Sequence, residues 1–278
     1  MKKPNLQSIF LRSIVYLAIL LTVSTLLLII GYILIKGIPH ITLDLFSLEY
    51  TSENVSLFPA MINTVTMTVL SLLIAAPLGI FSAIYLVEYA KRGNKLVSVI
   101  RTTAETLSGI PSIVYGLFGY LLFVAALGWG YSLLAGAFTL SIMILPLIIR
   151  TTEEALKSIP DAYREGSFGL GAGKLRTVFR IVLPSAVPGI LAGIVLSVGR
   201  IVGETAALIY TAGTVAQIPD NLMSSGRTLS IHLYALWVEG LNANQAYATA
   251  VVLLVIVIFL NAFSAYIAKW ISKGKTHG

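Results

Sequence analysis

Two charged residues lie deep within one apolar run of the sequence, and together they could handle an anion. Arg200 and Glu204 fall within residues 186–212, and their spacing places both side chains on one face of a helix. Ser197 and Thr211 fall on nearly the same stripe. A guanidinium presents forked donors to an oxyanion, and a neighbouring carboxylate could hold that fork or keep the anion from binding too tightly. The pattern therefore predicts a polar stripe that lines a substrate path.

The position of Arg200 within the run makes its charge costly. At a rise of about 1.5 Å per residue it lies roughly 20 Å from Ala186, and an isolated guanidinium at that depth costs about 3 kcal/mol. Charges inside a membrane often mark a pathway, which favours a role in transport. The alternative is a structural ion pair between Arg200 and Glu204 that faces a partner subunit.

A second pair of charges repeats this spacing. Arg101 and Glu105 precede the segment Gly109–Gly116, which reads GIPSIVYG. Pro111 lacks a backbone N–H and tends to break a helix, so we expect a discontinuous helix here. A break beside a cavity could place both charges on the substrate path. The alternative, favoured for Arg101, is a cytoplasmic helix that folds back into the membrane with its charges in water.

The composition indicates an all-α membrane protein. Of 278 residues, 57% are hydrophobic and 11% charged, and the mean hydropathy is +0.89. Six runs are long enough to cross about 30 Å of hydrocarbon, which predicts six transmembrane helices. They lie near residues 13–35, 60–87, 110–128, 132–149, 186–212 and 247–269. The absence of cysteine excludes disulfides and thiolate metal sites, and the three scattered histidines suggest no metal site.

Basic residues predict the orientation of these spans. Most of the 19 Lys and Arg residues lie before the first span, between the second and third, between the fourth and fifth, and after the sixth. We therefore expect both termini and residues 150–184 in the cytoplasm. This bias also explains the net charge of +7, so no nucleic-acid partner is expected. The outer segments, roughly 36–59 and 213–246, could receive an extracytoplasmic partner or simply connect helices.

The longest polar segment joins the fourth and fifth spans. From Glu165 to Pro184 it reads EGSFGLGAGKLRTVFRIVLP, and its glycines permit a turn with close backbone approach. The upstream residues Ile159-Pro160-Asp161 give a helix-start signal. Gly169–Lys174 superficially suggests a phosphate-binding loop, but Phe168 and Leu175 stand where such a loop needs Gly and Ser or Thr. We therefore expect that this chain does not itself bind ATP.

The spacing of this loop resembles the cytoplasmic loop of ABC importer permeases. In that family a Glu-Ala-Ala triplet is followed by three residues, Gly, nine residues, Ile, one residue and Leu-Pro. The matching residues are Glu165, Gly171, Ile181, Leu183 and Pro184, with Gly166 and Ser167 in place of the two alanines. The resemblance implies a type I importer (MetI-like) fold whose loop forms a coupling helix in a groove of a separate ATPase. That ATPase would use ATP-Mg, and this chain would bind no cofactor.

Three further segments resemble one branch of this family, the PstA-type permeases of phosphate importers in the bacterial inner membrane. They are Gly109–Gly116 (GIPSIVYG), Gly199–Ala207 (GRIVGETAA) and Ser225–Thr249. The resemblance implies an assembly with a homologous PstC-type permease, a dimer of PstB-type ATPases and an extracytoplasmic PstS-type phosphate-binding protein, surrounded by membrane lipids. In such an assembly this chain forms half of the translocation pathway.

The same residues also fit other functions. The first two segments also resemble the PstC-type sister permease, and an arginine stripe suits sulfate or molybdate equally well. An ion-coupled secondary transporter could use Arg200 and Glu204 without an ATPase, but it has no need for a loop like that from Glu165 to Pro184. The expected domains are an N-terminal helix with its outer loop (1–58) and a permease domain (59–272), which contains the coupling loop (150–184).

Overall fold

The structure, a computed structural model, describes residues 6–91, 93–240 and 242–273, and these form helices without any strand. The α-helices are α1 (Leu6–Gly37), α2 (Phe58–Ile84), α3 (Lys95–Ser108), α4 (Ser112–Gly119), α5 (Leu133–Lys157), α6 (Asp161–Gly169), α7 (Lys174–Thr177), α8 (Leu183–Val202), α9 (Ala206–Ile209), α10 (Leu229–Glu239) and α11 (Ala243–Lys273). The predicted all-α class is confirmed. Among the basic residues behind the predicted orientation, Lys2, Lys3, Arg92 and Lys275 lie outside the described residues.

Short turns of other helix types join these elements. The 3-10 turns Ile38–His40 and Leu43–Phe46 follow α1. A π-helical turn prolongs α2 (Tyr85–Tyr89), another prolongs α4 (Tyr120–Ala126), and another leads into α8 (Val178–Val182). The second half of the loop therefore enters α8 as continuous helix rather than as free coil.

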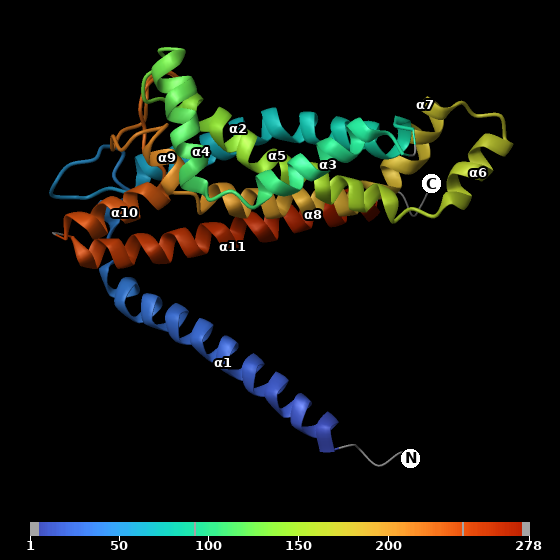
Figure 1. The fold of residues 1–278 in the computed structure, drawn as a ribbon. Helices are drawn as coiled ribbons and strands as arrows, with labels where there is room; N and C mark the ends of the chain where they lie inside the picture. Colours follow the sequence, from blue (N-terminus) through green and yellow to red (C-terminus); the bar gives the residue numbers. More distant parts are fainter. Residues whose placement is uncertain (1–5, 92, 241, 274–278) are drawn as a thin grey trace.

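The long helices α2, α5, α8 and α11 form the body of the molecule (Figure 1). Helix α5 packs between α2 and α8, and 67% of its apolar run is buried. Gly189 and Gly193 let α8 approach α5 closely, since an added Cβ would collide with Ala155 or Thr151. Helix α1 instead points away from the bundle, and none of its apolar run is buried, as befits a helix that faces lipid.

Within the described residues, five helices are long and apolar enough to cross a membrane, and a sixth span results if α3 and α4 count as one bent span. These two helices meet at an angle of 104° around Gly109–Pro111. The hydroxyl of Tyr115 braces the bend by donating to the carbonyl of Leu107 (2.8 Å). The expected discontinuity at Pro111 is confirmed, whereas the single run predicted at 110–128 is only the second half of this bent pair.

The fifth span ends earlier in the sequence than predicted. Helix α8 ends at Val202, Gly203 closes it, and the chain turns at Glu204 and Thr205 into the short α9. The prediction of one helix over 186–212 is wrong because tertiary packing places α9 across α4. Gly116 makes that contact possible, since a Cβ on it would lie 2.8 Å from the Cα of Ala207.

The two ends of the bundle differ in the elements that they carry. Helices α6 and α7 lie at one end, here called the α6 end, and α9 and α10 lie at the other, here called the α10 end (Figure 1). One buried cluster fills the middle of the bundle, with Met67, Leu140 and Met143 among its members. A second cluster, which includes Leu156 and Val182, supports the α6 end.

Candidate functional site

Helix α6 ends in a Schellman turn that depends on a glycine. The N–H of Ala172 donates to the carbonyl of Ser167 (3.1 Å), and the N–H of Gly171 donates to that of Phe168 (2.9 Å). Gly171 itself is left-handed, with φ +81°. A Cβ there would meet no atom within 4 Å, so the backbone conformation requires this glycine and close approach does not. The predicted turn is confirmed, and the loop glycines make no close approach to other parts of this chain.

A buried hydroxyl pair closes the loop behind this turn. The side-chain oxygens of Ser167 on α6 and Thr177 on α7 lie 2.8 Å apart, and both residues are buried. Ser167 replaces an alanine of the family pattern. Its hydroxyl gains a hydrogen bond that alanine cannot make, so this departure ties α6 to α7.

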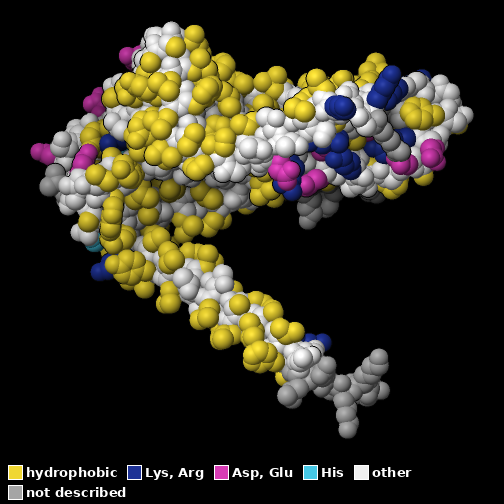
Figure 2. Space-filling view, in the orientation of Figure 1, with side chains coloured by type: hydrophobic (Ala, Val, Ile, Leu, Met, Phe, Trp, Pro, Cys, Tyr) yellow, Lys and Arg dark blue, Asp and Glu magenta, His cyan; other side chains and the backbone are white. Residues whose placement is uncertain are grey.

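The solvent side of the loop carries apolar side chains around a carboxylate. Glu165 and Gly166 are exposed. So are four large apolar side chains: Tyr163, Phe168, Leu175 and, at 91% exposure, Leu170. Many basic side chains also lie on the surface of the α6 end (Figure 2). An apolar patch with a polar rim is typical of a docking surface for another protein.

The last three residues of the predicted loop motif lie apart from this surface. Ile181 belongs to the π-helical turn, and its carbonyl accepts a hydrogen bond from Ser185 (2.7 Å). Leu183 packs against the second buried cluster, and Pro184 lies in the first turn of α8. These residues anchor the loop to the bundle, whereas Glu165 to Gly171 present its surface.

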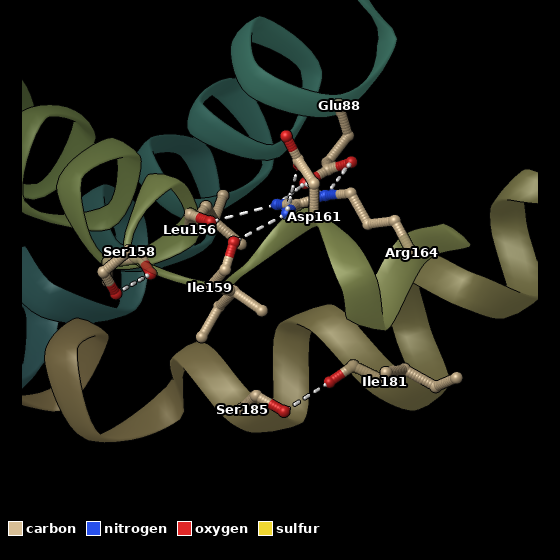
Figure 3. A network of polar contacts seen from close by, with 9 residues as sticks. Glu88, Leu156, Ser158, Ile159, Asp161, Arg164, Ile181 and Ser185 are labelled. Atoms are coloured by element: carbon tan, nitrogen blue, oxygen red, sulfur yellow. Dashed lines mark hydrogen bonds and ion pairs between the residues drawn. The ribbon is translucent and has the colours of Figure 1, made fainter. Parts of the chain in front are cut away.

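In the described part of the α6 end, two ion pairs connect separate helices, and the sequence alone did not predict either of them. Arg164 binds Glu88 in the turn after α2, with Nη2 2.7 Å from Oε1 (Figure 3). Arg101 on α3 binds Glu153 on α5, with Nε 3.0 Å from Oε2. Its partner is therefore Glu153 and not Glu105, which is exposed. The partners lie 76 positions apart in one pair and 52 in the other. No local pattern in the sequence connects them, so only the fold could reveal these pairs.

The predicted polar stripe is interrupted by the end of α8. Arg200 is half-buried in the last turn of α8, and Glu204 lies beyond the helix, buried. The Oε1 atom of Glu204 accepts the N–H of Ala207 (3.0 Å), so this carboxylate caps α9. The two charges share one end of the bundle, but the prediction that they share one continuous helical face is wrong.

Ser197 and Thr211, the other members of the stripe, are fully buried. The hydroxyl of Ser197 donates to the carbonyl of Gly193 (2.9 Å), and that of Thr211 donates to the carbonyl of Ala207 (2.9 Å). Both donors are therefore already used within their own helical turns. Among the four residues of the stripe, Arg200 has the donor groups best suited to a passing anion.

The α10 end holds a buried polar cluster that sequence reasoning also missed. Asn63 on α2 donates through Nδ2 to the carbonyls of Gln217 (2.9 Å) and Arg227 (3.1 Å). The guanidinium of Arg227 stacks over the ring of Tyr50, 4.6 Å from its centroid. His232 lies edge-on to the same ring, and burial together with the nearby charge of Arg227 lowers the pKa of His232 to about 3. These contacts pack the segments 36–59 and 213–246 against each other.

Residues 75–276 match the protein family described as "Binding-protein-dependent transport system inner membrane component". The chain is 32% identical over 264 residues to the probable ABC transporter permease protein YqgI of Bacillus subtilis. The aligned region covers 88% of this chain and 90% of that protein. It is 39% identical over 211 residues to the phosphate transport system permease protein PstA of Pasteurella multocida (75% and 74% covered). A chain in the solved structure of a bacterial alginate ABC transporter has a similar fold, with a TM-score of 0.69, 20% identity, and 96% and 98% covered.

Proposed function

The chain belongs to the family of binding-protein-dependent transport system inner membrane components, and on this premise we propose that it is the permease subunit of an ATP-driven phosphate importer. As a member of this family it is a multi-pass protein of the inner membrane. The proposal adds a substrate, an energy source and partners to that membership.

The observation that carries the proposal is the surface of α6. This helix extends beyond the bundle, ends in the Schellman turn at Gly171 and exposes Tyr163, Phe168 and Leu170 beside Glu165. An exposed helix of this kind suits insertion into a groove of another protein. We place the α6 end in the cytoplasm, where an ATPase dimer would bind it, and the ATPase would carry out all hydrolysis. A secondary transporter would have no use for this surface.

The substrate assignment combines the relatives with Arg200. Proteins named as phosphate transport permeases are similar over three quarters of the chain. Arg200 offers forked, charge-assisted donors, which suit phosphate but also sulfate and molybdate. In our proposal a homologous permease of the PstC type completes the pathway beside Arg200, and a phosphate-binding protein delivers the anion to the α10 end.

One experiment tests the coupling and the substrate together. The chain is co-purified in nanodiscs with the sister permease and ATPase of the same organism, and ATP hydrolysis is measured with added binding protein. Phosphate-loaded binding protein should stimulate hydrolysis, and binding protein offered sulfate or molybdate should not. Glu165→Lys, which reverses the charge on the α6 surface, should lose the ATPase during purification while the permeases stay paired. Equal stimulation by sulfate would refute the phosphate assignment, and full retention of the ATPase by Glu165→Lys would refute the docking assignment.

A further inference from the structure

A single side chain, Arg164, connects α6 to two helices of the bundle. Its Nη2 donates to Oε1 of Glu88 (2.7 Å) and to the carbonyl of Leu156 (3.0 Å). Its Nη1 donates to the carbonyl of Ile159 (2.8 Å) and to Oδ1 of Asp161 (3.2 Å), and its Nε also reaches Glu88 (3.2 Å). Figure 3 shows these contacts converging on the guanidinium. All three of its nitrogens are therefore engaged at once.

The contact is largely shielded from water. The side chain of Arg164 is 15% exposed and that of Glu88 is 7% exposed. Hydrogen bonding to Glu88 raises the pKa of Arg164 above its ordinary value. A paired charge at such a site is held in one geometry, because either partner alone would be left buried without compensation. The guanidinium binds the carboxylate of Glu88 through two nitrogens, which fixes the relative orientation of the two side chains.

Among the described residues, the main other contacts of α6 are with α7 and with the π-helical turn Val178–Val182. Ser167 is the one buried residue of α6, and its hydroxyl pairs with Thr177 on α7, which belongs to the same loop. A cleft of about 980 Å³ separates α6 from α3, with Arg164 and Glu88 in its wall. Without the Arg164 contacts, α6 would be held to the spans mainly by the short connection after Lys157 and by its packing on α7 and on the π-helical turn Val178–Val182.

We propose that Arg164 is a positioning residue that, through Glu88, transmits movement of α6 to α2. This inference rests on the proposed function, because it assumes that an ATPase moves α6. The carbonyls of Leu156 and Ile159 lie where α5 ends, and Glu88 lies in the turn that prolongs α2. A displacement of α6 therefore acts on α2 and α5 at one point. Because the guanidinium is rigid, α6 can move little without moving these two helices.

The test measures coupling in the assembled complex rather than assembly alone. Glu88→Gln keeps the size of the side chain and removes the charge that holds the fork. Complexes with this variant, reconstituted in liposomes with ATPase and binding protein, should retain the ATPase and hydrolyse ATP without binding protein at the wild-type rate. Phosphate transported per ATP hydrolysed should fall at least about fivefold, the low end of ordinary coupling between sites. Glu88→Asp, which keeps a carboxylate, should restore part of the loss.

Lys91→Gln supplies the matched control, because this exposed residue lies at the same end and its change also removes one charge. It should couple as the wild type does. If Glu88→Gln fails to assemble, Arg164→Lys carries the test, since it keeps the positive charge and loses the fork. It too should assemble and couple at least about fivefold less well.

The outcomes separate the two proposals. Wild-type coupling in assembled Glu88→Gln, or in Arg164→Lys if that variant is needed, would overturn the positioning role and leave the proposed function intact. A wild-type complex that moves phosphate without ATP hydrolysis would refute the proposed function itself. A purely structural role for the pair would lower thermal stability and yield, yet leave the transport-to-hydrolysis ratio of intact complexes unchanged.

Discussion

Arg101 on α3 and Glu153 on α5 form an ion pair that fixes the bent α3–α4 unit to the bundle. The Nε atom of Arg101 lies 3.0 Å from Oε2 of Glu153, and Nη2 donates to the carbonyl of Leu86 after α2 (3.2 Å). Lys157 reaches the same carboxylate oxygen at 2.6 Å. Two cations thus share one carboxylate that is 7% exposed, and α3 depends on it for its position beside α5.

Glu153→Gln should therefore destabilise the protein. The change leaves Arg101 and Lys157 without their counter-charge, but both cations are about half exposed and water compensates in part. We expect a loss of about 1–2 kcal/mol in the free energy of unfolding, between the values for exposed and buried pairs. Thermal unfolding in detergent measures it.

The neighbouring Glu154→Gln is the control for this prediction. Glu154 pairs with Arg150, but both side chains are about two-thirds exposed. This variant should unfold within about 0.5 kcal/mol of the wild type. Equal effects of the two substitutions would show that the Arg101–Glu153 pair does not hold α3.

Gly171→Val should weaken ATPase binding by distorting the end of α6. A β-branched residue at φ +81° is strained, at a cost of about 1–2 kcal/mol. The Schellman turn should open, and the amount of ATPase that co-purifies per permease should fall. Gly171→Asn should be milder, because asparagine tolerates the left-handed region.

Gly173→Ala tests whether the backbone angle is the cause. Gly173 has φ −71° and open space around its Cβ position, so alanine fits there without strain. It should retain the ATPase fully. If Gly171→Val retains as much ATPase as Gly173→Ala, the turn is not needed for docking.

Arg200→Gln should reduce phosphate uptake with normal assembly. Under our proposal the guanidinium makes charge-assisted hydrogen bonds to the passing anion, and each such bond contributes about 1.5–3 kcal/mol, or roughly tenfold or more in rate. Initial uptake rates in cells, corrected for the amount of complex, measure the effect. Arg12→Gln on the exposed face of α1 is the control and should transport normally. Uptake at the wild-type level in Arg200→Gln would leave Arg200 with a structural role only.

His232 should make the stability of the α10 end sensitive to acid. The pKa of His232 falls from 6.5 to about 3 on folding. Between these two pH values the unfolded chain therefore binds a proton at His232, whereas the folded protein keeps the imidazole neutral. The contribution of His232 to the free energy of unfolding is therefore fully present above pH 6.5 and declines as the pH falls towards 3. Between pH 7 and pH 5 the loss should be about 2 kcal/mol.

His232→Leu should remove this part of the pH dependence, and His40→Gln should not. Unfolding midpoints of the three proteins at pH 7 and pH 5 provide the comparison. The same change in midpoint for wild type and His232→Leu would show that another group is responsible.

Sequence reasoning predicted the features that local pattern determines. The apolar runs marked the long helices, Pro111 marked the break between α3 and α4, and the spacing around Gly171 marked a turn in the polar loop. It failed where packing overrides local preference. Residues Gly203 to Thr205 end α8 because α9 docks on α4, a contact that depends on Gly116 nearly ninety positions earlier. It likewise missed Arg164 and Glu88, which meet only in the folded chain.

The central claim is that movement of phosphate through this chain requires ATP hydrolysis by a partner bound at α6. Liposomes that contain the complete complex, with binding protein and labelled phosphate outside and either ATP-Mg or ADP-Mg inside, test it most directly. The account predicts accumulation of phosphate with ATP-Mg and none with ADP-Mg. Equal accumulation with ADP-Mg, or in liposomes that contain the permeases without the ATPase, would contradict it.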